Sequence, residues 1–172
     1  ISAYNLFSNV ERQIPNEGLH AYAINTPLFS DYAEKHRFFY LPPGAQVSCT
    51  SEGTLELPVG SALVKTFSFL HDRRASRQGE RIVETRILMH RPEGWVGYPY
   101  VWNEDLSEAR LAVAGARIDL KWIHDDGTAR ELRYNVPNMN QCKQCHKKGE
   151  VMGPIGFKLR QDGGGIGIDC LA

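Results

Sequence analysis

Short segments of alternating hydrophobic and polar residues run through the chain and predict β-strands. The clearest segment is residues 62–70, where Leu63, Lys65 and Phe67 share one side of an extended chain. Other β-prone runs cover residues 38–41, 81–91, 95–102, 118–123 and 129–136. Turn sequences of the hairpin type, Pro92-Glu93-Gly94 and Asp125-Asp126-Gly127, separate several of them. The pattern predicts a mainly β (α+β) fold built on an antiparallel sheet.

Helical signals are few, and they predict one or two short helices. The best helix candidate is residues 103–114, with Asn103 as the N-cap and Glu104 and Asp105 in the first turn. Ser30 or Asp31 could cap a second, shorter helical turn. Residues 1–27 are expected to be irregular, because prolines and a glycine break any period. Pro137 is expected to end the last strand.

Composition and charge narrow the class of protein. The chain has 172 residues, so we expect residues 1–172 to form a single domain. It carries 20 Lys and Arg and 20 Asp and Glu, and this balance argues against a nucleic-acid-binding protein. No apolar run approaches the roughly 20 residues that span a membrane, so we expect no membrane span.

The strongest chemical signal is the sequence Cys142-Lys143-Gln144-Cys145-His146. This C-x-x-C-H spacing is the attachment signature of a c-type haem. Each thiol adds to one vinyl group of the haem, and the adjacent histidine binds the iron as an axial ligand. We therefore predict haem c as the cofactor, attached at Cys142 and Cys145, with His146 as the iron ligand.

Three other interpretations of the two cysteines remain open. A zinc site would need a third and a fourth ligand from scattered residues. A thiol–disulfide redox motif would need a thioredoxin-like βαβ context, which the sequence lacks. A structural disulfide between Cys142 and Cys145 would close a strained ring.

The haem interpretation carries consequences for the other two cysteines and for the division of the chain. Because haem c is attached outside the cytoplasm, we expect a periplasmic or otherwise exported protein. Cys49 and Cys170 are then predicted to form a disulfide that ties the glycine-rich tail to the rest of the chain. Residues 1–136 would form a β-rich body, and residues 137–172 the haem-attachment segment and tail. The chain begins at Ile1 without a leader, so we expect a mature or trimmed form.

Several sequence blocks resemble an uncharacterised family of exported bacterial proteins with a C-terminal haem c domain. The resembling blocks are residues 28–33, 64–69, 84–86, 94–103 and 136–143. Members of this family are sometimes found beside, or fused to, propellers similar to quinoprotein sugar dehydrogenases. The resemblance covers nearly the whole chain. It implies a haem c domain and a redox partner protein such as a quinoprotein dehydrogenase.

Two looser resemblances add expectations about the site and the assembly. The Gly153-Pro154 pair resembles that of small class I c-type cytochromes, in which the proline carbonyl accepts a hydrogen bond from the haem-binding histidine. Pro154 would then orient His146. The position of the motif near the end of a β-rich chain is similar to cytochrome c-prime-beta and its hydroxylamine-oxidising relatives. That likeness implies an antiparallel β haem protein and a homodimer.

The ligand on the second face of the iron would decide the function. The candidates are Met89, His90, Met139, Met152, Lys65 or none, and on a strand only one of Met89 and His90 can face the haem. A methionine or histidine there favours an electron carrier, and an open face favours gas binding or catalysis. The aromatic residues of 95–102 could line the haem or form an ordinary core. The arginines of 73–77 could meet the haem propionates or an acidic partner.

Three functions follow, in order of preference. The first is a periplasmic monohaem c-type cytochrome domain in electron transfer, a carrier rather than a catalyst. The second is a haem enzyme or gas-binding sensor with an open distal iron site. The third is a binding module in which a metal is purely structural.

Overall fold

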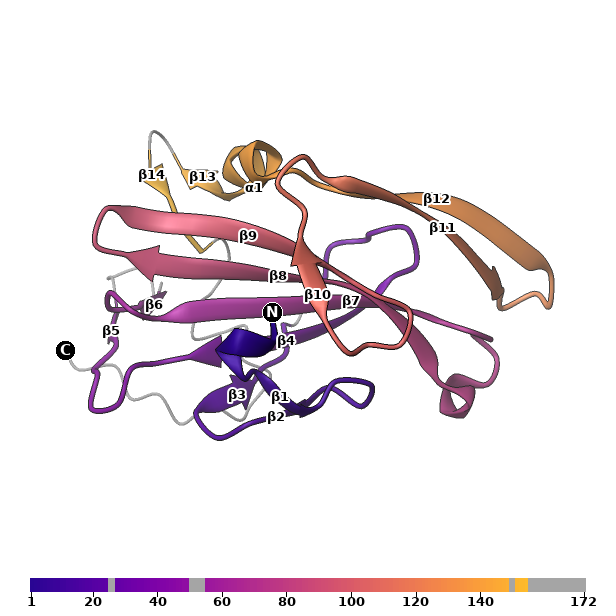
Figure 1. The fold of residues 1–172 in the computed structure, drawn as a ribbon, viewed down its shortest axis with the longest axis horizontal. Coiled ribbons are helices and arrows are strands. Elements are labelled where there is room, and N and C mark those ends of the chain that lie inside the picture. Colours follow the sequence, from indigo (N-terminus) through magenta and orange to yellow (C-terminus); the bar gives the residue numbers. More distant parts are fainter. Residues whose placement is uncertain (25–26, 50–54, 149–150, 155–172) are drawn as a thin grey trace.

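A six-stranded antiparallel sheet forms the centre of the molecule (Figure 1). The computed structural model describes residues 1–24, 27–49, 55–148 and 151–154. The strands follow the order β10-β9-β8-β7-β4-β3. Their bounds are β3 Leu19–Ala21, β4 Glu34–Tyr40, β7 Ala62–Leu70, β8 Glu80–Arg91, β9 Gly94–Trp102 and β10 Ala109–Leu111.

Smaller elements surround this sheet. Four two-stranded ribbons pair β1 Phe7–Asn9 with β2 Ile14–Pro15, β5 Ser48–Cys49 with β6 Leu55–Glu56, β11 Ala116–Ile123 with β12 Ala129–Val136, and β13 Lys147–Lys148 with β14 Val151–Met152. Within the described residues the α-helix is α1, Met139–His146, and short 3-10 turns occupy Ser2–Tyr4 and Ser76–Gln78. The prediction of a mainly β fold with antiparallel sheets is confirmed.

The longer strands lie where the alternation predicts them. Strands β7 and β12 have the predicted bounds, and β8, β9 and β11 begin one or two residues earlier than expected. The strand predicted at 38–41 corresponds to the end of β4, which begins earlier, at Glu34, and stops one residue sooner, at Tyr40. The expectation of irregular structure for residues 1–27 is only partly right, because β1, β2 and β3 lie in that segment.

The predicted helix over residues 103–114 is wrong. The side chain of Asn103 accepts a hydrogen bond from the Glu108 amide at 3.1 Å, and Asp105 accepts one from the Ser107 amide at 2.9 Å. These side-chain bonds to nearby amides form turns instead of capping a helix. Residues Ala109–Leu111 then pair with β9 as the edge strand β10.

The short helical turn expected at Ser30 or Asp31 is also absent. Asp31 and Tyr32 have φ angles of 50° and 66°, and the Ala33 amide donates to the Ser30 carbonyl at 2.8 Å. The segment is a tight turn leading into β4. The helix that the structure does contain, α1, covers the cysteine motif, which the hydrophobic pattern did not mark as helical.

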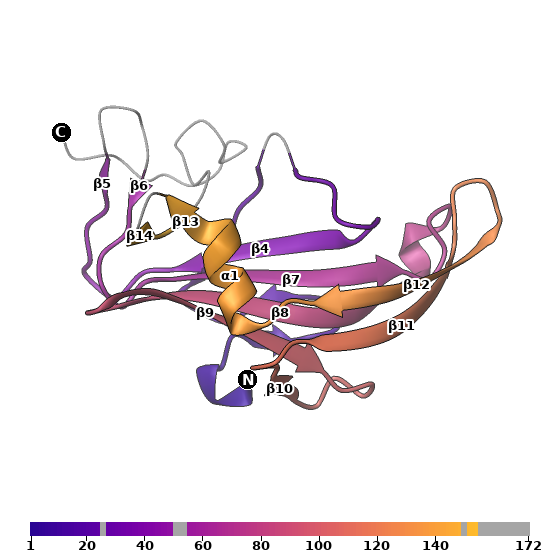
Figure 2. The same ribbon diagram turned by 90° about the horizontal axis from the view of Figure 1, so that it is seen from above.

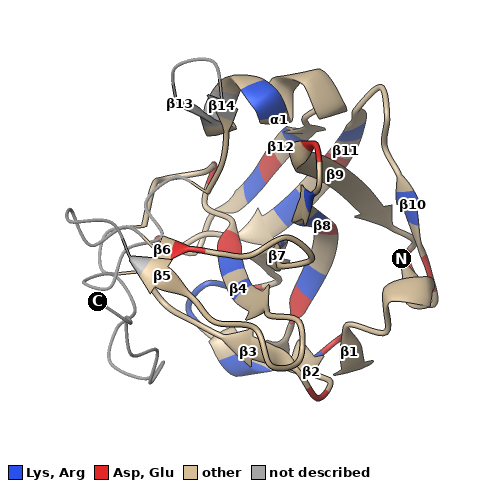
Figure 3. Cartoon of the chain, turned by 90° about the vertical axis from the view of Figure 1, so that its left-hand side faces the viewer, with Lys and Arg blue, Asp and Glu red and all other residues tan. Residues whose placement is uncertain are grey.

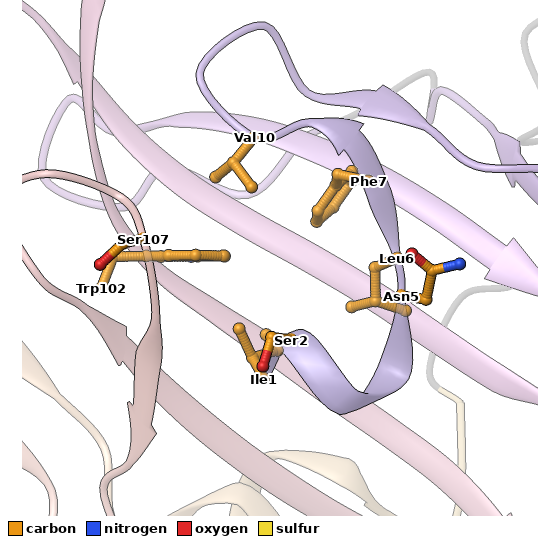
Figure 4. Close-up of a pocket in the computed structure, with 8 residues that line it drawn as sticks. All are labelled: Ile1, Ser2, Asn5, Leu6, Phe7, Val10, Trp102 and Ser107. Carbon is orange, nitrogen blue, oxygen red and sulfur yellow. The ribbon is translucent and has the colours of Figure 1, made fainter.

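The two faces of the central sheet have different partners. One face, here called the N-terminal face, carries Val64 and Ile87 and packs against residues of the N-terminal segment. The hydrophobic residues buried in its core are Leu19, Phe38, Ala62, Val64, Ile82, Ile87, Tyr100, Trp102 and Ala109. A cavity of about 180 Å³ opens beside this core between Trp102, Phe7 and Val10 (Figure 4).

The opposite face, here called the helix face, carries Leu63, Lys65 and Phe67 of β7, because successive side chains of a strand alternate. Figure 2 shows α1 lying across this sheet, between the β13–β14 hairpin and the β11–β12 ribbon. The ribbon covers one end of the face, where Phe69 of β7 and Val83 of β8 form an apolar cluster with four residues of the ribbon, Leu120, Trp122, Tyr134 and Val136. Near β5 and β6, a second apolar cluster comprises Phe39, Val47, Leu55 and Leu57.

A β-bulge in β8 affects which side chains reach each face. Phe67 pairs with Glu84, and the next residue of β7, Ser68, pairs with Ile82. Val83 is therefore an extra residue in β8. It packs in the apolar cluster under β11–β12, whereas Ile82 packs on the N-terminal face.

Candidate functional site

Helix α1 begins immediately after the residues that connect it to β12. The Asn138 side chain accepts a hydrogen bond from the Gln141 amide at 2.8 Å, and the Gln141 side chain accepts one from the Asn138 amide at 2.9 Å. This reciprocal arrangement is a capping box. Because Cys142 and His146 are four residues apart, they lie on the same face of α1, one turn from each other. Cys142 is buried and His146 is half-buried.

Gly97 of β9 permits the close approach of this segment to the sheet. A Cβ atom at Gly97 would lie 2.9 Å from Cβ of Cys142 and 3.3 Å from Cε of Met152. Any larger residue would therefore push α1 or β14 away from β9. We did not single out Gly97 from the sequence, although a lone glycine among the aromatic residues of a strand is a known sign of close approach.

The β13–β14 hairpin fixes the orientation of His146. Lys147 pairs with Met152, so the next pair outward brings His146 opposite Gly153. The Gly153 amide donates to the His146 carbonyl at 2.8 Å, and Nδ1 of His146 lies 3.2 Å from the Gly153 carbonyl oxygen. The expected acceptor, Pro154, is one residue too far along the chain. The carbonyl that orients His146 belongs to Gly153, because the hairpin register selects it.

The surroundings of His146 favour a neutral imidazole. Burial lowers its pKa, and the positive charges of Lys65 and Arg86 lower it further, while the hydrogen bond to Gly153 acts in the opposite direction. With Nδ1 directed at a backbone carbonyl, Nε2 is the nitrogen left for a metal. A neutral imidazole held in this way is typical of histidines that bind metals.

A row of three basic residues crosses the middle of the helix face. Arg37 of β4 pairs directly with Lys65 of β7, and Lys65 pairs directly with Arg86 of β8. Such cross-strand neighbours have Cβ atoms about 5 Å apart. Basic residues of these strands are blue at the centre of the molecule, below α1, in Figure 3. Lys65 Nζ and the Arg86 guanidinium both lie over the Phe67 ring, 4.6 Å and 4.2 Å from its centroid.

The charges of this row are only partly neutralised within the described residues. Arg86 binds the fully buried Glu84 through two hydrogen bonds, one of them 3.0 Å from Nε. Tyr134 of β12 also donates to Glu84, at 2.5 Å. Burial lowers the pKa of Lys65 to about 8, and the positive charges of Arg37, Arg86 and Lys35 contribute, while Glu84 opposes them. Burial also lowers the pKa of Arg37.

The candidates for a second iron ligand are distributed over both faces. Met89 packs against the core of the N-terminal face, whereas its neighbour His90 is on the helix face, as strand alternation requires. The His90 ring stacks on Trp95 at 4.5 Å, and its Nδ1 lies 2.8 Å from the Leu57 carbonyl oxygen. Lys65 is also on the helix face, on an interior strand.

The two remaining methionines belong to the motif segment itself. Met139 is the first residue of α1, and Met152 lies beside Cys142 against Gly97. Met152 is therefore on the same side of the segment as Cys142.

The aromatic residues of β9 also divide between the faces. Tyr100 and Trp102 are buried in the core of the N-terminal face, and Tyr98 packs against that core. Trp95 is on the helix face, where its Cδ1 would lie 4.0 Å from a Cβ at Gly153. Of these four residues, Trp95 is thus the one that lies beside the segment carrying His146.

Two of the three arginines of the 71–79 loop, Arg73 and Arg74, already have acidic partners. Arg73 pairs with Glu34 at 3.4 Å and with Asp125 at 3.2 Å, and Arg74 pairs with Asp72 at 2.7 Å. The charges of Arg73 and Arg74 are balanced locally, whereas Arg37 and Lys65 pair with no carboxylate of the described residues.

Some of the predicted features lie outside the described residues. The structure describes Cys145 and Cys49 by their backbone only, and Cys170 and the glycine-rich tail not at all. The Cys49–Cys170 disulfide therefore stays a prediction. Sequence reasoning missed Arg37 and Arg86, because their position beside Lys65 depends on strand register that no local pattern specifies.

Within the described ranges, no three His, Cys, Asp or Glu side chains cluster as a metal site would require. None of the helices there has the length and apolar character needed to cross a membrane. Comparisons with family models, with curated proteins and with solved structures gave no match to this chain.

Proposed function

We propose that the protein is an exported, periplasmic monohaem c-type cytochrome domain that functions in electron transfer. The haem is attached at Cys142 and Cys145, and His146 is the axial ligand of the iron. Its partner is a redox protein such as a quinoprotein dehydrogenase. The observation that carries the proposal is the geometry of His146, whose Nδ1 points at the Gly153 carbonyl one helical turn from Cys142.

The residues present fit this cofactor. A C-x-x-C-H sequence on a helix presents its first cysteine and its histidine from the same face. The fixed Nδ1 leaves Nε2 as the metal ligand, and the lowered pKa of His146 favours the neutral ring that a metal requires. Gly97 supplies room on the sheet for the motif segment.

When bound, the haem supplies an iron that accepts and releases one electron. The chain's own residues position the ligand and exclude water. The capping box starts α1 at a fixed position, and the hairpin register orients the His146 ring. The packing of Cys142 against β9 excludes water from one side of the motif.

Mass spectrometry of the protein, produced in a host that matures c-type cytochromes, tests the proposal directly. We expect one haem per chain, covalently retained after denaturation. The double variant Cys142→Ser, Cys145→Ser should carry none, whereas the matched control Cys49→Ser should keep it. A wild-type protein without covalent haem would contradict the proposal.

A second function, a haem enzyme or gas-binding sensor with an open distal site, is favoured by the placement of two methionines. Met89 packs in the core of the opposite face, and Met152 lies on the same side of the segment as Cys142. The sheet would therefore separate Met89 from an iron bound to His146, and Met152 would share the side of the segment that carries Cys142. The reduced spectrum with carbon monoxide separates the two functions: a large shift indicates an open or labile site, and an unchanged spectrum indicates a six-coordinate carrier.

A further inference from the structure

The row Arg37–Lys65–Arg86 is an unusual feature for the middle of a sheet face. It lies between a row of mostly apolar residues, Phe39, Leu63, Leu88 and Gly97, and a row that contains Phe67 and Glu84. Like charges directly opposite one another on a sheet repel and destabilise it. A fold that serves stability alone would place apolar residues or hydrogen-bonded neutral residues there, as the other face of the same strands does.

The described residues provide one carboxylate for these three cations. Glu84 is held by Arg86 and by Tyr134, so its charge is largely committed to Arg86. Arg37 donates to the Lys35 carbonyl at 3.1 Å, and no carboxylate of the described residues pairs with it. Lys65 Nζ likewise has no hydrogen-bond acceptor among them, and its contact is the Phe67 ring.

The row also lies close to the candidate haem ligand. Gly97, in the row next to Lys65 and Arg86, packs against Cys142 of α1, and His146 lies one helical turn from Cys142, so these groups share one region of the helix face. Guanidinium and ammonium groups bind carboxylates and other oxyanions through strong charge-assisted hydrogen bonds. Two half-buried cations side by side, paired with no carboxylate of the described residues, form the chemical complement of such a group.

We propose that Arg37 and Lys65, supported by Arg86, form a binding site for an oxyanion group beside His146. The anion would neutralise both cations and restore the charge balance of the helix face. Phe67, beneath Lys65 and Arg86, limits where the two side chains can reach. The same chemistry could come from two sources, a propionate of the attached haem or a free small oxyanion. The first source rests on the proposed function, and the second does not.

Calorimetric titration with sulfate at constant ionic strength tests the site. The haem-free protein should bind sulfate, and Lys65→Met and Arg37→Gln should each weaken binding by about tenfold. Lys121→Met is the matched control, because Lys121 is an exposed lysine of β11 paired with Glu131 at 2.6 Å. Its affinity should stay within about twofold of wild type. Circular dichroism establishes that each variant is folded.

The haem-loaded protein identifies the source of the anion. If a propionate occupies the row, sulfate affinity should fall by about tenfold or more on loading, and if the row serves a free oxyanion, the affinity should be retained. Mass spectrometry reports haem attachment separately, so its failure is distinct from failure of the anion site. Equal sulfate binding by wild type and both row variants, or no binding by the haem-free wild type, would overturn the inference.

Discussion

The two faces of the central sheet use the same strands and have opposite chemistry. On the N-terminal face three buried polar side chains of the strands satisfy one another: Thr66 and Thr85 are hydrogen-bonded at 2.8 Å, and the Trp102 indole donates to Thr85 at 2.9 Å. On the helix face, two apolar clusters flank a row of basic residues that the described residues neutralise only in part. A face that completes its own interactions serves stability, and one that leaves charges unmatched indicates a ligand.

The largest expected effect is a truncation in the core of the N-terminal face. Ile87 is 1% exposed, so Ile87→Ala should lower the free energy of unfolding by about 3 kcal/mol through lost burial and the remaining cavity. Urea denaturation measures this loss. Sulfate binding to the folded variant should be unchanged, and a parallel loss of binding would mean that the two faces are not separable.

A smaller effect is expected from the buried hydrogen bonds of the same face. Thr85→Val keeps the shape of the side chain but leaves the Trp102 indole and the Thr66 hydroxyl without their partner. Because unsatisfied buried groups retain their desolvation cost, stability should fall by about 2 kcal/mol. If Thr85→Val unfolds at the same urea concentration as wild type, this face is not stabilised by its polar network.

The third prediction concerns Glu80, a carboxylate at the edge of the N-terminal face that is hydrogen-bonded to His36 and Ser68. Burial raises the pKa of Glu80, but hydrogen bonds from His36 and Ser68 lower it, and the net shift is downward. Because the folded pKa lies below that of the unfolded chain, Glu80 contributes stability above pH 4.5 and loses it as the pH falls through the folded pKa. Glu80→Gln should therefore cost about 1.5 kcal/mol near pH 7.

The pH dependence of the stability difference between wild type and Glu80→Gln tests the role of the charge more directly. The stabilities of wild type and Glu80→Gln, obtained from urea denaturation at several pH values, should converge in acid. A gap that is constant across this range would show that the carboxylate charge is not what stabilises the cluster.

The smallest effect has the opposite sign and lies on the helix face. Lys65→Met removes a half-buried charge that stands between Arg37 and Arg86, so the haem-free protein should become more stable by about 1 kcal/mol. Lys121→Met, at the surface, should change stability by less than about 0.5 kcal/mol. A destabilised Lys65→Met variant would indicate that the row is already neutralised.

The alternation of hydrophobic and polar residues was enough to predict the long strands. It failed where polar side chains form hydrogen bonds with nearby backbone amides. Alternation in residues 62–70 and 129–136 depends only on neighbours in sequence. The expected helix over 103–114 failed because Asn103 and Asp105, good N-caps, are equally good at closing turns.

The candidate site likewise has features that the sequence shows and features that depend on strand pairing. The spacing of Cys142, Cys145 and His146 is visible in the sequence. The choice of Gly153 over Pro154 depends on hairpin register, and the alignment of Arg37 with Lys65 and Arg86 depends on the pairing of strands far apart in the chain. Neither can be read from a linear pattern.

Because of the β-bulge at Val83, β8 has one position where a residue can be lost without moving the other side chains of the strand to the opposite face of the sheet. Deletion of Val83 would leave Ile82 directly before Glu84, the spacing that ordinary alternation needs to keep them on opposite faces. The pairing of Glu84–Arg91 with β9 would not shift. Deletion of Thr85 would instead make Glu84 and Arg86 adjacent, so that the two could no longer share the helix face. Natural length variation in β8 should therefore concentrate at residue 83.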